Sequence, residues 1–323
     1  MRIGVNPEKY KGEKNTPYSH RIVIPVYIPN IHESYYQESI AVLDYCLTSV
    51  IQTINPQTTA ITLINNNSTT LINEVIEKHL PFIDKLVTYT ENKGKVYAVI
   101  NEVRSVFEPF VTIADADVLF MSGWEQAVFE IFNNYPNAGA ITPLPTPNSA
   151  YHLNTSVYFD HFLFGKMKYD KIVADEDIDL YLQGLNNSAL INRKGKFNWR
   201  EKQYFLDGKI KAVVGALHFV TTYKSAVFRN QSSFPEIKFI NGYETEFIDK
   251  LPDLNGLYRL STVKTFAYHI GNKVDDFVIK TTFDNNMKLD SDFINNIKTP
   301  AKSLIPYWIK SLYFRALKRI MKL

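Results

Sequence analysis

Two aspartates, Asp115 and Asp117, form the strongest chemical signal in the sequence. They follow the short apolar run 110–113, which predicts a buried strand. Two carboxylates at a strand end can reach one divalent cation and one ribose hydroxyl in the same crevice. Hard cations such as Mn2+ and Mg2+ prefer oxygen ligands and often share substrate phosphates. A cation here would neutralise a diphosphate leaving group, although such a pair also occurs in solvated surface turns.

The elements around this pair alternate between strand and helix patterns. Short apolar runs predict strands, and apolar residues at spacings of three and four predict helices. The predicted strands are 21–27, 60–64, 86–89, 110–113 and 138–142, and the predicted helices are 40–54, 71–80, 96–103 and 124–134. Repeated strand–helix units predict an α/β fold whose mostly parallel sheet is covered by helices on both faces. Because ligands bind such sheets beyond the carboxyl ends of the strands, the polar residues there should share one crevice.

The pattern weakens in the second half of the chain. The prolines and tyrosines of 143–211 predict irregular structure, and the acidic run 175–179 predicts a solvated loop. Regular patterns return in a strand at 212–219, a helix start at 243–251 and a strand at 262–268 that ends at His269. In this half, candidate functional residues must therefore be identified from individual polar residues, because the alternating strand–helix pattern is absent.

Composition narrows the class of protein. With 323 residues and 45% hydrophobic and 21% charged content, the chain can form a sizeable globular core. A net charge of +3 is too small to indicate a nucleic-acid partner. One cysteine, Cys46, excludes an intrachain disulfide and fits a reducing compartment. The sequence has neither an apolar signal segment at its start nor an apolar run of about 18 residues, so we expect a cytoplasmic protein.

The C-terminal tail, 303–323, has the pattern of a basic amphipathic helix. One predicted face carries the apolar residues Ile305, Ile309, Leu312, Ala316 and Ile320, and Trp308 flanks it. Arg315, Lys318 and Lys322 are expected mostly on the other face. Such a helix either packs on the protein's own core or lies on an anionic membrane surface. Its basic residues favour the membrane, which predicts a peripheral protein on the inner face of the plasma membrane.

Six short motifs occur in a fixed order along the chain. They are 22–27, 65–69, 92–94 with Ala98, 115–117, 242–247 and 268–272. In order and spacing they resemble the motifs of family 2 glycosyltransferases, and the resemblance covers about residues 20–272. It implies the α/β GT-A fold, which is a Rossmann-like, mostly parallel sheet with helices on both faces, here with a C-terminal helical extension. It divides the chain into an N-terminal extension (1–20), a nucleotide-sugar-binding half (21–142), an acceptor-binding and catalytic half (143–275) and the basic helical extension (276–323).

The resemblance also implies a reaction and its residues. A sugar moves with inversion from a nucleoside-diphosphate donor, expected to be UDP-linked, to a hydroxyl of a glycan or lipid-linked glycan acceptor in surface polysaccharide synthesis. Asp117 and His269 are implied ligands of Mn2+ or Mg2+, Asp115 assists through water or binds the ribose, and Glu244 is the catalytic base. The implied donor-binding residues are Pro25, Tyr27, Asn66, Asn92, Lys95, Asp115 and Ala116.

Two departures from the family pattern affect specific roles. The loop 65–67 has asparagines where the family has an acidic residue for the nucleotide base, although asparagine can both donate to and accept from a uracil edge. The family's Glu-Asp pair is replaced by Tyr243 and Glu244, and Glu246 lies close by, so Glu244 is preferred by register. Each residue also has a structural alternative: His269 as a core histidine, Glu244 as an acid at a helix start, and Asn92 as a turn or cap.

Three other classes of protein can be compared with this interpretation. A sugar nucleotidyltransferase also uses a nucleotide and paired aspartates, but it needs a glycine-rich basic loop after the first strand, and 25–32 contains no glycine. No Gly-x-x-x-x-Gly-Lys-Ser/Thr run occurs, which argues against a P-loop hydrolase. The third possibility is a degenerate transferase fold that serves as a carbohydrate-binding or scaffold module, and the asparagine cluster is compatible with it.

Overall fold

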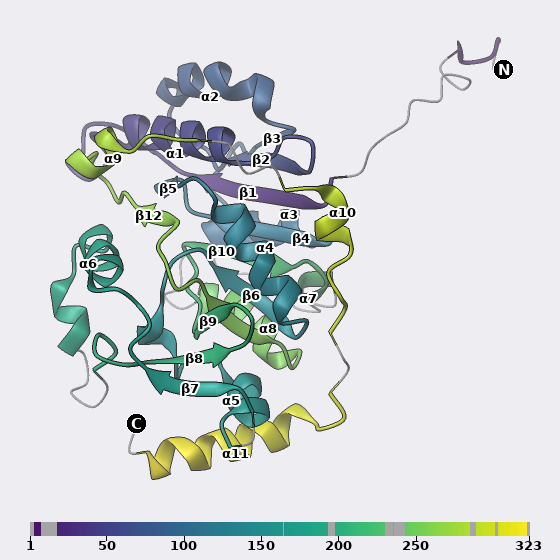
Figure 1. The fold of residues 1–323 in the computed structure, drawn as a ribbon. Coiled ribbons are helices and arrows are strands. Elements are labelled where there is room, and N and C mark those ends of the chain that lie inside the picture. The colour runs from purple at the N-terminus through teal and green to yellow at the C-terminus, as the bar shows by residue number, and fades with distance from the viewer. Residues whose placement is uncertain are drawn as a thin grey trace.

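One large mixed sheet organises the computed structural model, which describes residues 3–7, 18–163, 165–192, 198–229, 235, 243–284, 289–300 and 303–321. Within these residues the sheet has ten strands in the order β3-β2-β1-β4-β10-β6-β11-β9-β8-β7 (Figure 1). Their bounds are β1 (His20–Val26), β2 (Thr59–Asn65), β3 (Lys85–Thr88), β4 (Phe110–Ala114), β6 (Ala138–Thr142), β7 (Met167–Asp170), β8 (Gln203–Asp207), β9 (Lys211–Val214), β10 (Val220–Lys224) and β11 (Tyr258–Ser261).

The first four strands run parallel, as the repeated strand–helix pattern predicts. β1 pairs with both β2 and β4 in parallel, and β2 pairs with β3 in parallel. The second half adds antiparallel strands: β10 lies between β4 and β6, and β7, β8 and β9 form a meander. A separate two-stranded sheet joins β5 (Val118–Phe120) to β12 (Ala267–His269). It brings the chain after Asp117 beside His269, although the two segments are far apart in the sequence.

Helices cover both faces of the sheet (Figure 1). On β1, Ile22 and Ile24 belong to the core layer that contains α1 (Ser39–Thr53) and α4 (Trp124–Asn134). Val23 points the other way, into the layer that contains α3 (Lys95–Val103). This alternation is what a buried strand of an α/β sheet requires. The remaining helices are α2 (Asn73–His79), α5 (Thr155–His161), α6 (Asp175–Gly184), α7 (Ala226–Arg229), a π-helix (Thr245–Asp249), α8 (Leu251–Leu254), α9 (Asp276–Lys280), α10 (Ser291–Asn295) and α11 (Tyr307–Ile320).

Several expectations for the second half are wrong. The strand expected at 262–268 is limited to β12 (Ala267–His269), and residues 262–266 form no strand. The acidic run 175–179 is not a loop but the first turn of α6, where carboxylates interact favourably with the helix dipole. The single strand expected at 212–219 is interrupted, because Gly215 adopts a φ of +133° and β9 ends at Val214. The region 143–211 also contains α5, β7 and β8, so it is more regular than its prolines indicate.

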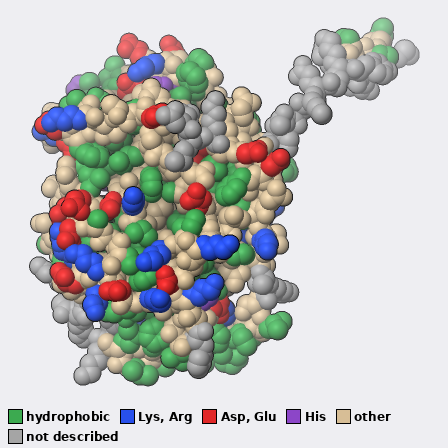
Figure 2. Space-filling view, in the orientation of Figure 1, with side chains coloured by type: hydrophobic (Ala, Val, Ile, Leu, Met, Phe, Trp, Pro, Cys, Tyr) green, Lys and Arg blue, Asp and Glu red, His purple; other side chains and the backbone are tan. Residues whose placement is uncertain are grey.

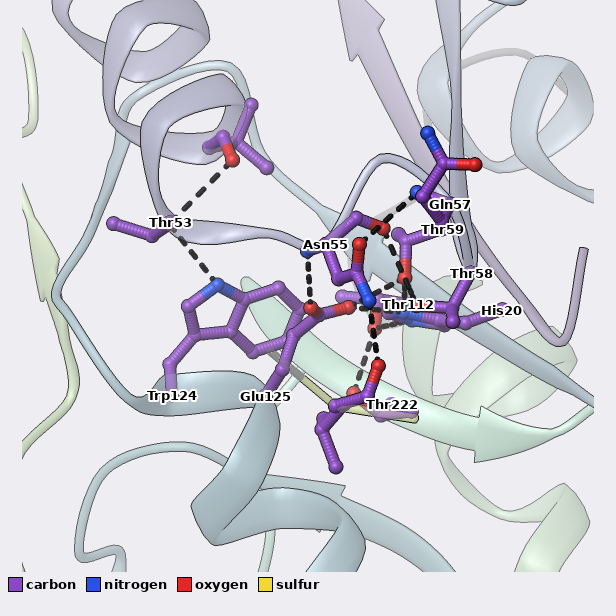
Figure 3. Close-up of polar contacts among 12 residues, drawn as sticks. His20, Thr53, Asn55, Gln57, Thr58, Thr59, Thr112, Trp124, Glu125 and Thr222 are labelled. Atoms are coloured by element: carbon purple, nitrogen blue, oxygen red, sulfur yellow. Dashed lines mark hydrogen bonds and ion pairs between the residues drawn. The ribbon is translucent and has the colours of Figure 1, made fainter. Parts of the chain in front are cut away.

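A buried polar network joins the sheet to α4 (Figure 3). His20 Nδ1 lies 2.9 Å from Glu125 Oε1, and His20 Nε2 lies 2.7 Å from Thr112 Oγ1. The Thr59 hydroxyl donates to Glu125 Oε1 at 2.6 Å, and the Asn55 N–H donates to Oε2 at 3.0 Å. His20 and Thr59 are the first residues of β1 and β2, so the network fixes these strands at the ends opposite to the polar loops.

Candidate active site

A crevice of about 310 Å³ opens beyond the carboxyl ends of β1, β2 and β4. All the residues that the sequence assigns to donor binding line it, together with Asp117. They are Pro25, Tyr27, Asn66, Asn92, Lys95, Asp115 and Ala116. Tyr35 and Tyr36 also line it and were not predicted, although an aromatic pair soon after the first strand is a visible signal. Their rings contact each other at 5.0 Å between centroids.

Asp115 is anchored by its backbone and by a lysine. Its N–H donates to the Phe219 carbonyl oxygen at 2.7 Å, which ties the end of β4 to the residue that precedes β10. Its Oδ1 atom lies 2.6 Å from Lys95 Nζ. Lys95 begins α3, directly after Gly94, whose φ of +80° is readily accessible only to glycine. The strand and helix ends therefore hold a carboxylate and a cation together at the floor of the crevice.

Asp117 is a half-buried carboxylate whose side chain is 28% exposed. Burial raises its pKa to about 6, since a desolvated carboxylate favours the neutral form. Its Oδ1 atom is buried and has no hydrogen-bond partner among the described residues. Its backbone oxygen accepts from the Ile270 N–H at 2.7 Å, which holds the segment after β12 beside it. A buried, unsatisfied carboxylate oxygen is costly unless it has a ligand, so this atom is a candidate to bind one.

His269 lies beside Asp117 but is not among the residues that line the crevice. Its Nε2 atom lies 3.5 Å from Asp117 Oδ2, and its Nδ1 atom lies 3.0 Å from the Gly184 carbonyl oxygen. Because a carbonyl only accepts, Nδ1 carries the proton, and Nε2 can offer a lone pair toward Asp117. Metal-binding histidines are commonly oriented in this way. The ring also packs edge-on against Phe219 at 5.0 Å.

Glu244 does not line the crevice but contacts Lys95, which does: Lys95 Nζ lies 3.5 Å from Glu244 Oε1. Burial raises the pKa of Glu244, but the Lys95 charge and other contacts outweigh it, and the net pKa is below the ordinary value. Burial likewise lowers the pKa of Lys95, but Asp115 and Glu244 outweigh it and raise the pKa. Glu246 points elsewhere, since it pairs with Lys250 and its side chain is 58% exposed. Gly242, the first residue of the predicted motif, lies outside the described residues.

The asparagines of the crevice bond to each other and to the loop. Asn66 Nδ2 donates to Asn92 Oδ1 at 3.0 Å, and Asn66 Oδ1 accepts from the Lys93 N–H at 2.9 Å. Asn92 Oδ1 also accepts from the Gly94 N–H at 2.8 Å. These bonds hold the loops after β2 and β3 together at the crevice wall. Both residues thus shape the loops in addition to lining the site.

Three further residues could stack on a sugar or act as a nucleophile, but all three are buried in the core. Trp124 is fully buried and donates from Nε1 to Thr53 Oγ1 at 3.2 Å, and Trp199 is 3% exposed. Neither is available to stack on a sugar. Cys46 is buried in α1, and burial raises the pKa of its thiol far above the ordinary value, so it is a poor nucleophile.

The residues present fit a divalent cation that shares its ligands with a substrate. Among the described residues no cluster of three or more His, Cys, Asp or Glu side chains forms a complete protein cage. The unsatisfied Asp117 Oδ1 and the oriented His269 Nε2 instead form a pair of ligand atoms. Mg2+ and related ions often take only one or two protein ligands and complete their shell with phosphate oxygens and water. The donor set therefore suits a metal–diphosphate complex better than a free ion.

The mixed sheet and the crevice at its carboxyl edge agree with the α/β fold that the sequence motifs imply. Residues 28–198, more than half of the chain, match Glycosyl transferase family 2. The protein belongs to this family, and the resemblance found in the sequence motifs is confirmed. A search of curated proteins found no significant match.

Solved structures show weaker similarity. The mannosyltransferase PcManGT from Pyrobaculum calidifontis, in complex with GDP-Man and Mn2+, shares 14% identity over 80% of this chain and 59% of its own, with a TM-score of 0.45. S. aureus TarS 1–349, in complex with UDP, shares 12% identity over 77% of this chain and 60% of its own, with a TM-score of 0.42. The chain thus spans about 60% of the length of these two structures.

Proposed function

We propose that the protein transfers a sugar from a nucleoside-diphosphate donor to an acceptor hydroxyl with inversion at the anomeric carbon. The supporting observation is the convergence of one oriented histidine, two aspartates, one lysine and one glutamate at the carboxyl edge of the sheet. Asp117 and His269 come from different halves of the chain and lie 3.5 Å apart. The donor half is 21–142, and the acceptor and catalytic half is 143–275.

The proposed donor is a UDP-sugar. Tyr27 and Tyr35 are 40% and 61% exposed at the crevice and can stack on a base or sugar. Asn66 is 2% exposed and its amide is engaged by Asn92 and the Lys93 N–H, so its proposed role is to hold the crevice wall rather than to contact the base directly. Asp115 binds the ribose or assists the metal through water. The donor screen should include both UDP-sugars and GDP-sugars.

The proposed cofactor is Mn2+ or Mg2+, held by Asp117 and His269 with diphosphate oxygens and water. When bound, the cation neutralises charge that develops on the leaving diphosphate. Lys95 adds a second positive charge at the edge of the same region, 2.6 Å from Asp115. Lys95 and the proposed cation would thus both place positive charge near the proposed diphosphate.

Glu244 is the proposed catalytic base. Its lowered pKa keeps the carboxylate ionised at neutral pH, so it can accept the proton of an acceptor hydroxyl. That hydroxyl then attacks the anomeric carbon from the face opposite the leaving diphosphate. General-base catalysis of this kind contributes about 10²–10⁴-fold in rate. The proposed acceptor is a glycan or lipid-linked glycan used in surface polysaccharide synthesis, on the inner face of the plasma membrane.

A calorimetric titration tests the donor site first. We expect UDP to bind in the presence of Mn2+ and to bind much more weakly in EDTA, and Asp117→Asn to lose the metal dependence. Metal-independent binding of glycans with no nucleotide binding would instead favour a carbohydrate-binding module. A second assay measures metal-dependent hydrolysis of UDP- and GDP-sugars. A third assay supplies a sugar phosphate and a nucleoside triphosphate instead. Release of pyrophosphate in this third assay would indicate a nucleotidyltransferase.

Transfer to an acceptor tests the base. We expect Glu244→Gln to lose about 10²–10⁴-fold in turnover while it retains Mn2+-dependent UDP binding. Glu246→Gln is the matched control, since this exposed carboxylate pairs with Lys250 outside the crevice. Near-normal transfer by Glu244→Gln would show that another group is the base.

A further inference from the structure

The C-terminal helix α11 has one face inside the protein. Phe314 and Leu317 are buried, and the Phe314 ring lies 5.0 Å from the Tyr158 ring of α5, centroid to centroid. Lys310, which is 1% exposed, places Nζ 3.0 Å from Asp160 Oδ1. The expectation that the tail can pack on the protein's own core therefore holds for this face. It is not the apolar face predicted from the sequence.

The apolar face predicted from the sequence is largely exposed. Trp308, Leu312 and Ile320 are 63%, 53% and 79% exposed, and spacings of four and eight residues place them in one stripe along the helix. Leu304, shortly before the helix, is 94% exposed. Figure 2 shows hydrophobic side chains gathered along the lower edge of the molecule, where Figure 1 places α11. Large exposed apolar patches of this kind mark interaction surfaces.

The exposed face also carries positive charge. Arg315 and Arg319 are exposed, and helical geometry places both beside Trp308, which corrects the expected position of Arg315 on the opposite face. The sequence 303–321 contains no Asp or Glu. The carboxylates that contact α11 are engaged on its packed side, where Asp160 pairs with Lys310 and Asp253 accepts from the Tyr307 hydroxyl at 2.9 Å. Lys322 lies outside the described residues.

We propose that this exposed face, the α11 stripe (Trp308, Leu312, Arg315, Arg319 and Ile320), binds the surface of an anionic lipid bilayer. Apolar side chains that alternate with arginines on one helix face suit the boundary between headgroups and acyl chains. No helix among the described residues is long and apolar enough to cross a bilayer, so the contact is superficial. A second copy fits less well, because a symmetric pair would bring arginines toward arginines with no acid in either stripe.

Vesicle flotation tests this proposal on the full chain without donor, acceptor or metal, so its outcome is independent of the proposed transfer reaction. We expect the protein to float with phosphatidylcholine vesicles that contain phosphatidylglycerol, and to remain unbound with phosphatidylcholine alone. Binding should weaken as NaCl is raised, because salt screens the arginine contribution. The fluorescence of Trp308 should shift to the blue on binding, since Trp124 and Trp199 are already buried.

Substitutions separate the stripe from the rest of the surface. We expect Trp308→Ser, and separately the double variant Arg315→Glu/Arg319→Glu, to reduce partitioning by on the order of tenfold or more. The matched controls are Phe82→Ser, which removes a 60% exposed aromatic ring, and Lys78→Glu/Lys280→Glu. These positions lie in or next to α2 and α9, at the opposite end of the molecule (Figure 1). The controls should bind as the parent does.

Three results would overturn the proposal. The first is equal partitioning of the stripe variants and their controls. The second is equal binding to neutral and anionic vesicles. The third is a dimer in light scattering that Trp308→Ser converts to a monomer, with no vesicle binding by the parent, since the stripe would then be an interface between copies. Circular dichroism of each variant confirms that the exposed substitutions leave the fold intact.

Discussion

The ring of His269 is held by Gly184, with its Nδ1 atom 3.0 Å from a carbonyl oxygen 85 residues earlier in the chain. Gly184 is the last residue of α6 and packs directly on the backbone of β12. A Cβ atom at this position would lie 2.9 Å from the His269 carbonyl oxygen and 3.1 Å from the Tyr268 ring. The absence of a side chain thus allows α6 to approach closely enough to orient the proposed metal ligand.

Gly184→Ala should lower the affinity for Mn2+ more than it lowers the stability of the fold. The added methyl group must displace β12, which turns the His269 ring away from Asp117. Because partners that orient a metal ligand typically contribute 10–100-fold in affinity, we expect at least a tenfold rise in the Mn2+ concentration needed for UDP binding. Gly208→Ala is the control, because its Cβ would lie 2.6 Å from the Tyr135 hydroxyl, and it should lower stability without this change. An unchanged Mn2+ requirement in Gly184→Ala would contradict the proposed orientation.

Lys95→Met should alter the pH dependence of transfer. Lys95 lowers the pKa of Glu244, so its removal should raise that pKa and shift the acid limb of the kcat/KM profile to higher pH. Donor KM should rise as well, since the charge that faces the diphosphate is lost. Lys93→Met is a close control, because Lys93 pairs with Glu91 in the neighbouring loop. If the acid limb stays in place in Lys95→Met, Lys95 does not set the charge state of the base.

Asp117→Asn should separate function from stability. The substitution removes a carboxylate whose buried Oδ1 has no hydrogen-bond partner among the described residues. Without metal, the parent must keep this costly group buried, so we expect the metal-free variant to melt at the same temperature or higher. Metal-dependent UDP binding should be lost. A large drop in the melting temperature of the metal-free variant would indicate that Asp117 is a structural residue.

Lys224 gives a pH-dependent contribution to stability. Burial lowers its pKa to about 8, although Nζ donates to the Pro136 carbonyl oxygen at 2.5 Å. Between about pH 8 and the ordinary pKa of 10.5, the unfolded chain binds more protons at this site, so the free energy of unfolding rises with pH. Relative to Lys224→Met, the parent should gain about 1–3 kcal/mol between about pH 7.5 and about pH 10.5 in urea unfolding. Lys280→Met, at an exposed position, should show no such difference from the parent.

The first half of the fold is predictable because its signals are local. Runs such as 110–113 bury completely and place Asp115 and Asp117 at a strand end, as the apolar pattern indicates. The acidic first turn of α6 indicates a solvated loop, whereas the apolar residues Ile178, Tyr181 and Leu182 lie on the buried face of the helix. Apolar residues separated by three residues and then one residue lie on the same face of a helix, so this spacing indicates a helix in the sequence.

The contacts that complete the site have no local signal. Nothing near Gly184 in the sequence indicates that it will hold His269, since the contact depends on how α6 docks against β12. The packed face of α11 is equally unpredictable, because it is decided by Tyr158 and Asp160 of α5. Periodicity identifies that a helix has apolar faces, but tertiary packing decides which of them stays in water.

The network around His20 and Glu125 lies at one end of β1, whereas Pro25 and Tyr27 reach the crevice at the other. The sequence of the loops that line the crevice can therefore change without a change in the buried network that fixes β1 and β2. Exchange of the loops at 25–28, 65–69 and 92–95 should change which donor the proposed site accepts while β1 and β2 keep their register. A design for a new donor specificity should retain Glu125 and substitute only residues of these three loops.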